Sequence, residues 1–152
     1  MIEIVSDHSF ALPPAQLWPQ LRNHHFLIEI IPDIHEVKEV TDDSAHCVIR
    51  PGFAFIRGTL NVELQVLEAT EPNVIRFQLN SKGIGTSSES EATLTLAEKD
   101  QGTAAELKLV VQKLGGLLKM VPKGLIRGSA DKVVADAWSR LEAKLSNPEE
   151  SS

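Results

Sequence analysis

Histidine is the residue type in this sequence best suited to bind a metal ion or move a proton, and the chain has five histidines. His24 and His25 are adjacent, so on a helix their side chains point about 100° apart and cannot chelate one ion as an i, i+4 pair does. His8, His35 and His46 show no ligand spacing either. We therefore expect each of these histidines to lie at the surface or to be hydrogen-bonded within the protein, and we expect no metal site.

Nucleophiles and cofactor motifs are the next candidates for chemistry. Cys47 is the single cysteine, and it lies in an alternating strand pattern without a neighbouring activating group. The motifs G-x-S-x-G and G-x-G-x-x-G and the P-loop do not occur in the sequence. The glycine- and serine-rich residues 83–88 predict a turn rather than a phosphate cradle, because no helix follows them. The sequence therefore predicts no catalytic residue and no cofactor.

A third candidate is a group of basic residues near the start of a long helical pattern. Lys119, Lys123 and Arg127 are spaced four apart, which places them on one helix face. Residues 113–132 carry a charge of +4 in a chain of −6, so the remainder carries −10. Cations near a helix start gain nothing from the helix dipole. A solvated helix face would explain them, and the alternative is docking to an anionic membrane surface or an acidic partner. The apolar residues alongside are Leu117, Leu118, Met120 and Val121.

The composition is that of one globular domain. The chain has 152 residues, 42% hydrophobic and 24% charged, and we expect a single domain over residues 1–146 with a frayed acidic tail at 147–152. The net charge of −6 and the lack of tyrosine argue against a nucleic-acid-binding surface. No apolar run reaches the roughly 18 residues of a membrane span, and the first residues show no signal-peptide pattern. We therefore expect a cytoplasmic protein that at most touches a membrane peripherally.

The hydrophobic pattern predicts the elements that must position these residues. Period-two alternation predicts a strand over residues 2–12, followed by a short helix that starts at a proline pair. A second short helix is expected over residues 26–31. Six further strands follow between residues 37 and 111, separated by turn-forming residues. From residue 115 onward, a period of 3.6 predicts a helix of about thirty residues with a kink or restart at Pro122.

These elements imply an α+β fold. A strongly curved antiparallel sheet of about seven strands would have one dry face, and the C-terminal helix would have one apolar stripe. Both surfaces are buried most economically if the helix crosses the concave face of the sheet. A ligand cavity, if there is one, would then lie between the sheet and the helix.

Four stretches carry a resemblance to a known family. They read FALPPAQLWPQL at residues 10–21, LIEIIPDIHEV at 27–37, IRGTLNVEL at 56–64 and GGLLKMVPKGLIRGSADKVVADAWSRL at 115–141. The chain resembles the START-like (SRPBCC, pollen-allergen-like) helix-grip superfamily and, within it, the G-subunit family of carbon monoxide dehydrogenase. The resemblance implies a deep apolar cavity, in which relatives hold lipids, quinones, sterols or polyketides and some act on them. The dehydrogenase-associated members look like accessory factors that bind an apolar molecule and dock at the membrane, several through a C-terminal anchor; this chain stops at residue 152, so we expect no permanent anchoring.

The residues expected to line the cavity are those that face inward by strand alternation and by the helix stripe. Ser88 and Ser90, with Thr86, share the face of Leu94 and would offer hydroxyls to the polar head of a ligand. The alternatives are an ordinary packed core and a strand that runs out into solvent. The expected lining is Ile49, Ile56, Leu60, Val62, Leu64, Ile75, Phe77, Leu79, Ser88, Ser90, Leu94, Leu107, Leu109, Leu125, Val133 and Ala137.

These observations favour a protein that binds or carries an apolar small molecule such as a quinone, lipid or isoprenoid, as an accessory factor to a membrane-associated redox enzyme. One alternative is a polyketide cyclase- or dehydratase-type enzyme, which would need an acid or base inside the cavity. His46 and Arg50 alternate to the wet face, so the enzyme is the less favoured interpretation. The other alternative is an adaptor that docks a partner protein through Lys119, Lys123 and Arg127.

Overall fold

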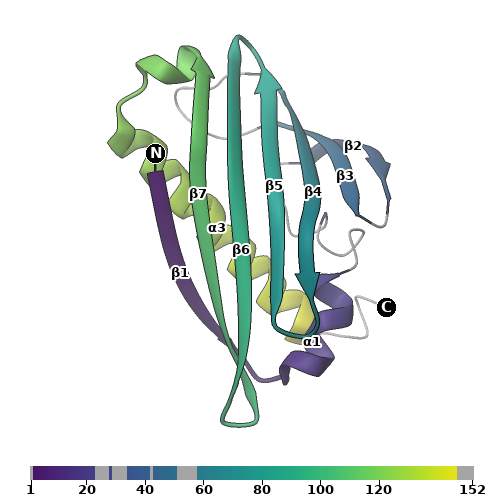
Figure 1. The fold of residues 1–152 in the computed structure, drawn as a ribbon. Helices are drawn as coiled ribbons and strands as arrows, with labels where there is room; N and C mark the ends of the chain where they lie inside the picture. The colour runs from purple at the N-terminus through teal and green to yellow at the C-terminus, as the bar shows by residue number, and fades with distance from the viewer. Residues whose placement is uncertain (1, 23–27, 29–33, 42, 51–57, 147–152) are drawn as a thin grey trace.

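The computed structural model shows one curved sheet with a long helix across one of its faces (Figure 1). It describes residues 2–22, 28, 34–41, 43–50 and 58–146. The tail at 147–152, the predicted cavity residue Ile56 and, apart from Ile28, the predicted second helix over 26–31 lie outside the described residues.

The order of the elements confirms the predicted α+β helix-grip fold, with seven strands followed by the long helix. One short helix, α1, follows the first strand within the described residues, where two were predicted. The elements are β1 (Ile2–Phe10), α1 (Pro14–Leu21), β2 (Ile34–Val40), β3 (Ser44–Ile49), β4 (Leu60–Thr70), β5 (Val74–Gly83), β6 (Thr86–Lys99), β7 (Gly102–Gly116), the 3-10 helix η1 (Leu117–Met120) and α3 (Lys123–Ser146).

The seven strands form an antiparallel sheet in the order β1-β7-β6-β5-β4-β3-β2. Strands β2 to β7 are therefore a meander in which each strand pairs with the next along the chain. The N-terminal strand β1 then pairs with the last strand, β7, with Ile2 opposite Val111 and Phe10 opposite Thr103. This pairing makes β1 an edge of the sheet, directly beside the connection from β7 to the C-terminal helix (Figure 1).

Alternation of apolar and polar side chains gives the sheet one dry and one wet face. In β4, Leu60 and Leu64 are buried, whereas Asn61 and Glu63 between them are exposed. Neighbouring strands keep the same phase, because Leu64 lies opposite Leu79. We call the dry face, against which α3 packs, the inner face and the other the outer face.

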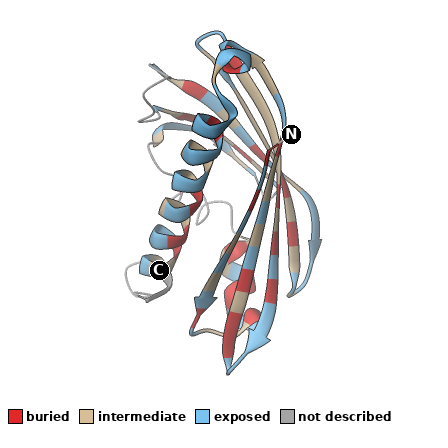
Figure 2. Cartoon of the chain, turned by 90° about the vertical axis from the view of Figure 1, so that its left-hand side faces the viewer, coloured by how far each residue is buried: buried red, intermediate tan, exposed pale blue. Residues whose placement is uncertain are grey.

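The C-terminal half of α3 anchors the helix to the inner face. Trp138 is buried among the core side chains, and its indole N–H donates to Ser6 Oγ of β1 at 2.8 Å. The His8 ring stacks on the Trp138 ring with centroids 5.3 Å apart, and His8 Nε2 lies 3.1 Å from Glu142 Oε2. The buried residues of α3 follow the side of the helix that faces the sheet (Figure 2).

The start of the long helix differs from the prediction. Strand β7 continues to Gly116, η1 follows, and α3 begins only at Lys123. Gly116 has a φ of 61°, a left-handed conformation that glycine adopts readily and that ends the strand. Pro122 has no N–H to donate within a helix, so it suits the position just before α3, where its carbonyl accepts from the Leu125 N–H at 3.0 Å.

Candidate ligand-binding cavity

A cavity of about 220 Å³ lies between the inner face of the sheet and the first half of α3. Strands β3 to β7 supply its floor, and η1 and α3 supply its cover. The predicted residues found in its lining are Ile49, Leu60, Val62, Leu79, Ser88, Ser90, Leu109 and Val133.

Other residues predicted for the cavity belong to the packed core at the opposite end of the inner face. Large side chains pack together at that end, among them Trp18, Trp138 and Phe10. The predicted residues placed in or against this core are Leu64, Ile75, Phe77, Leu94 and Leu107. Ala137 is half-buried and is not among the residues that line the cavity.

The predicted cavity residue Leu125 faces solvent instead. Its side chain is 55% exposed, whereas its neighbour Ile126 is 8% exposed and lines the cavity. Successive helical residues are rotated by about 100°, so an error of one residue in the phase of the helix moves a side chain from the cavity to solvent. Ser129 and Ala130, which were not predicted, also line the cavity from α3.

Strand β7 contributes two further lining residues, of which Val111 continues the alternation from Leu109 and Leu114 does not. Val111 and Leu114 both line the cavity although they are three positions apart. A register shift explains this, because Ser90 pairs with Val111 and Glu89 with Lys113, which leaves one extra residue in β7. Leu118 of η1, and Asn80 and Ser81 of β5, complete the lining. Ser81 could have been found by extending the β5 alternation two residues past Leu79.

The polar groups of the cavity lining are neutral hydroxyls and an amide. The hydroxyls of Ser81 and Ser88 lie opposite each other on β5 and β6 and form a hydrogen bond of 2.5 Å. Ser90 and Ser129 add further hydroxyls from β6 and α3. The Thr86 hydroxyl, also predicted to face the cavity, instead donates to the Gly83 carbonyl at 2.7 Å within the β5–β6 turn.

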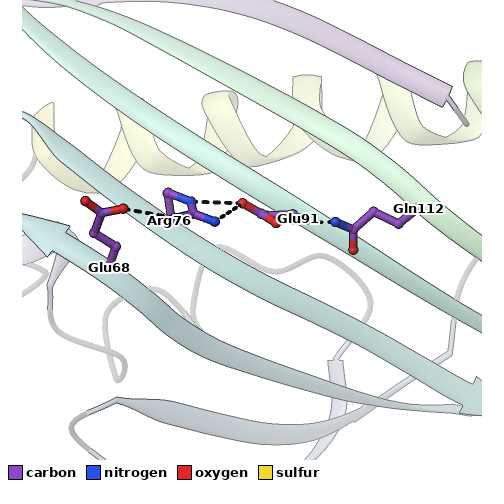
Figure 3. A network of polar contacts seen from close by, with 4 residues as sticks. All are labelled: Glu68, Arg76, Glu91 and Gln112. Carbon is purple, nitrogen blue, oxygen red and sulfur yellow. Dashed lines mark hydrogen bonds and ion pairs between the residues drawn. The ribbon is translucent and has the colours of Figure 1, made fainter.

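On the outer face, a polar network crosses the strands that form the cavity floor (Figure 3). Arg76 donates from Nε and Nη2 to Glu91 Oε1 at 2.9 and 2.6 Å, and from Nη1 to Glu68 Oε2 at 3.0 Å. Gln112 Nε2 donates to Glu91 Oε2 at 3.3 Å. The hydrogen bonds to Glu91 and then to Glu68 raise the pKa of Arg76 further. The network therefore ties β4, β5, β6 and β7 together on the outer face.

The outer face also carries a polar hollow of about 710 Å³, which the sequence did not predict and which shares Asn80, Ser81, Ser88 and Leu114 with the cavity lining. His46 lies in it with Nε2 3.3 Å from Asn61 Oδ1, and Lys113 pairs with Glu89 at 3.5 Å. Because its lining carries charges of both signs, its chemistry does not select a single class of ligand.

Cys47 is buried in β3, and burial raises the pKa of its thiol. A raised pKa keeps the sulfur protonated at neutral pH, and a thiol is a much weaker nucleophile than a thiolate. The expectation that Cys47 is not activated agrees with this environment.

The three predicted docking residues are exposed but do not share one helix face. Lys119 belongs to η1, whereas Lys123 and Arg127 lie four residues apart on α3. The break at Pro122 separates them, because the helix does not continue back to residue 119. Lys119 and Lys123 still lie together, beside a small hollow that also includes Ile2 and Lys113. None of the described helices is long and apolar enough to cross a bilayer.

Comparisons with known proteins agree with this architecture. A conserved protein from Geobacillus kaustophilus is 14% identical, with 96% of each chain covered and a TM-score of 0.86. Ms6760 from Mycobacterium smegmatis is 14% identical, with 96% of this chain and 92% of that chain covered and a TM-score of 0.71. The AHSA1 protein from Silicibacter pomeroyi is also 14% identical, with 95% and 98% covered and a TM-score of 0.63. At such identities these structures show a shared fold.

No curated protein matches the chain. A family model described as CoxG, the G subunit of carbon monoxide dehydrogenase, matches residues 8–146, which is nearly the whole of the described chain. The match includes every strand that lines the cavity and the whole of α3. With its helix-grip fold and an apolar cavity between sheet and helix, the chain belongs to the CoxG family of the START-like (SRPBCC) superfamily.

Proposed function

We propose that this protein binds and carries a neutral apolar small molecule that bears an oxygen atom, such as a quinone or an isoprenoid alcohol. The observation that carries the proposal is the cavity, which is lined by aliphatic side chains and by the neutral hydroxyls of Ser81, Ser88 and Ser90. Burial of apolar ligand area contributes about 25 cal/mol per Å² to binding. The residues that line the cavity carry no charge, so a carboxylate or phosphate head inside it would lose its hydration without gaining a countercharge.

The serine pair supports a ligand with a carbonyl or hydroxyl oxygen. Each hydroxyl has one hydrogen to donate, and the Ser81–Ser88 hydrogen bond uses only one of the two. The other hydroxyl hydrogen is available to a ligand oxygen. A quinone carbonyl, which accepts and does not donate, fits this arrangement.

The volume of the cavity favours a small buried group. At about 220 Å³ it is below the roughly 300–1,000 Å³ of typical ligand pockets. A single ring with a short chain suits that space better than a lipid with two acyl chains. A longer isoprenoid chain would extend past the cover formed by η1 and α3.

The family supports a role as accessory factor to a redox enzyme. The description of the matching family refers to a subunit of carbon monoxide dehydrogenase. A quinone carried in the cavity would accept or deliver electrons for such an enzyme.

Organic extraction of the purified protein, followed by mass spectrometry, tests the proposal directly. We expect a stoichiometric quinone or isoprenoid, and we expect the emptied protein to bind a short-chain naphthoquinone in a calorimetric titration. An Ala130→Phe variant fills the cavity from α3 and should abolish this binding.

Ala135→Phe is the matched control, because Ala135 is exposed on the same helix and should leave the affinity unchanged. Equal naphthoquinone affinity in the wild type and in the folded Ala130→Phe variant would contradict the proposal.

A further inference from the structure

Three exposed apolar residues belong to the segments at the end of the molecule where the β5–β6 turn lies beside η1. Ile84 is 43% exposed, Leu117 59% and Met120 83%, and we call these three residues the apolar tip. The Leu117 N–H donates to the Gly85 carbonyl at 2.9 Å, which holds η1 against the turn. In Figure 1 these segments lie together at the upper end of β5, β6 and β7.

Ile84 is an unusual residue for its position. Gly83 pairs with Thr86, so Ile84 and Gly85 form a two-residue hairpin turn, and their φ angles are 56° and 72°. Turns with two positive φ angles favour Asn, Asp and Gly, whereas a β-branched side chain is strained there. The other two-residue turn of this sheet uses the polar pair Asp100 and Gln101 at φ angles of 51° and 68°.

The fold accounts for an isoleucine at position 84 only in part. Its side chain lies over Gly58, where an added Cβ would be 3.1 Å from Ile84 Cδ1, and yet it stays 43% exposed. Strained residues that persist in a structure are a starting point for a functional hypothesis. An apolar side chain held at the end of a turn is suited to contact an apolar phase outside the protein.

Basic residues lie close to the apolar tip along the chain. Lys82 precedes the turn, Lys119 lies within η1, and Lys123 and Arg127 follow on α3. In the part of the chain that the structure describes, these four residues form no ion pair, whereas nearby Lys113 pairs with Glu89. Residues 113–132 carry +4 in a chain of net charge −6. Apolar residues rimmed by cations are the pattern of a surface that docks to anionic lipid.

The apolar tip is also continuous with the cover of the cavity. Within η1, Leu118 is 6% exposed and lines the cavity, whereas Leu117 and Met120 project outward. Contact of the outward residues with a bilayer would therefore hold the end of the cavity against the lipid.

We propose that the apolar tip inserts into the surface of an anionic membrane, with Lys82, Lys119, Lys123 and Arg127 against the lipid headgroups. Charge complementarity argues for an anionic lipid surface. The net charge of −10 outside residues 113–132 would repel such a surface, whereas the net charge of +4 within these residues attracts it. The proposed docking through the apolar tip depends on these observations and not on the proposed function. The further step, that an apolar ligand is exchanged with the bilayer at this end, rests on the proposed function.

Co-sedimentation with vesicles tests the docking. We expect binding to vesicles of phosphatidylcholine mixed with phosphatidylserine, little binding to phosphatidylcholine alone, and a loss of binding as salt is raised. Replacing Lys119, Lys123 and Arg127 by Glu should weaken binding by at least roughly fivefold for each residue changed. Lys99→Glu is the control, because Lys99 is exposed at the opposite end of β6.

The variant Ile84→Asn separates docking from folding. Asn suits a positive φ, so this variant should have a higher Tm than the wild type and still bind the vesicles more weakly. Leu117→Ser and Met120→Ser should also weaken vesicle binding, whereas Leu67→Ser, 46% exposed on β4, should not.

Vesicle binding that is unchanged in the Ile84→Asn and Met120→Ser variants would overturn the proposal. The proposal would also be overturned if, in sedimentation without vesicles, the wild type were a dimer and these variants were monomers. A second copy of the chain would then occupy the apolar tip. Binding of the naphthoquinone to the emptied protein in the absence of vesicles reports on the proposed function separately from docking.

Discussion

Among the individual residues, a few serines in an aliphatic surface give the cavity its polar character. Ser81 and Ser88 face each other across β5 and β6, and their hydroxyls bond to each other while they line the cavity. Within the pair one hydroxyl donates and the other accepts, which leaves one hydrogen for a ligand. Affinity therefore comes mainly from the aliphatic residues, and the hydroxyl pair selects the orientation of the ligand.

Removal of this pair should weaken ligand binding by a modest factor. We expect the double variant Ser81→Ala/Ser88→Ala to bind the naphthoquinone about fivefold more weakly, because one net hydrogen bond contributes about 1 kcal/mol. The measurement is a calorimetric titration of the emptied protein. Ser87→Ala is the control, because Ser87 alternates to the outer face next to Ser88. If Ser87→Ala weakens binding as much as the double variant does, the pair does not contact the ligand.

Among the elements, α3 has two halves with different packing. Its C-terminal half is anchored by Trp138 and by the contact of Glu142 with His8. Its first half covers the cavity and contains Gly124 and Gly128, where an added Cβ would meet no atom within 4 Å. Packing does not require these glycines, and each lowers the stability of the helix. The cover of the cavity is therefore the less stable half of the helix.

A Gly128→Ala variant should stabilise the protein and slow ligand exchange. Replacing an exposed helical glycine by alanine raises the free energy of unfolding by about 0.5–1 kcal/mol. Thermal unfolding measures the gain, and the release rate of the naphthoquinone measures the exchange. Gly102→Ala should instead lower the Tm, because its Cβ would lie 2.3 Å from the Phe10 carbonyl oxygen. A lower Tm for Gly128→Ala would show that residue 128 has a packing role.

Across the whole molecule, the inner face of the sheet is divided between stability and binding. One end holds the aromatic core around Trp18 and Trp138, and the other holds the cavity beneath η1. The outer-face network of Arg76 ties together the four strands β4 to β7 that continue across both ends. Substitutions at the two ends should consequently affect different properties.

Ile75→Ala should destabilise the protein without changing its ligand affinity. Ile75 is 1% exposed in the core and does not line the cavity, so its truncation should lower the free energy of unfolding by about 2–5 kcal/mol. Denaturant unfolding and the naphthoquinone titration measure the two properties on the same sample. A large loss of affinity in the folded variant would show that the core and the cavity are coupled.

Local sequence patterns were enough to predict the seven strands, the long C-terminal helix and how they must pack, although not where that helix begins. The alternation of apolar and polar residues predicts β4 to β6, because a strand with one dry face has an apolar residue at every second position. The seven-stranded sheet and the long C-terminal helix then follow, since their apolar surfaces must cover each other.

The position of the cavity and the identity of its lining depend on contacts between distant parts of the chain. The bulge that brings Val111 and Leu114 to one face depends on the partner strand β6, which alternation within β7 does not show. The choice of Ile126 over Leu125 depends on the phase of a helix that begins at Lys123. Whether an inward residue meets empty space or a neighbour depends on the volumes of side chains far apart in the sequence, such as Trp138 against Phe10.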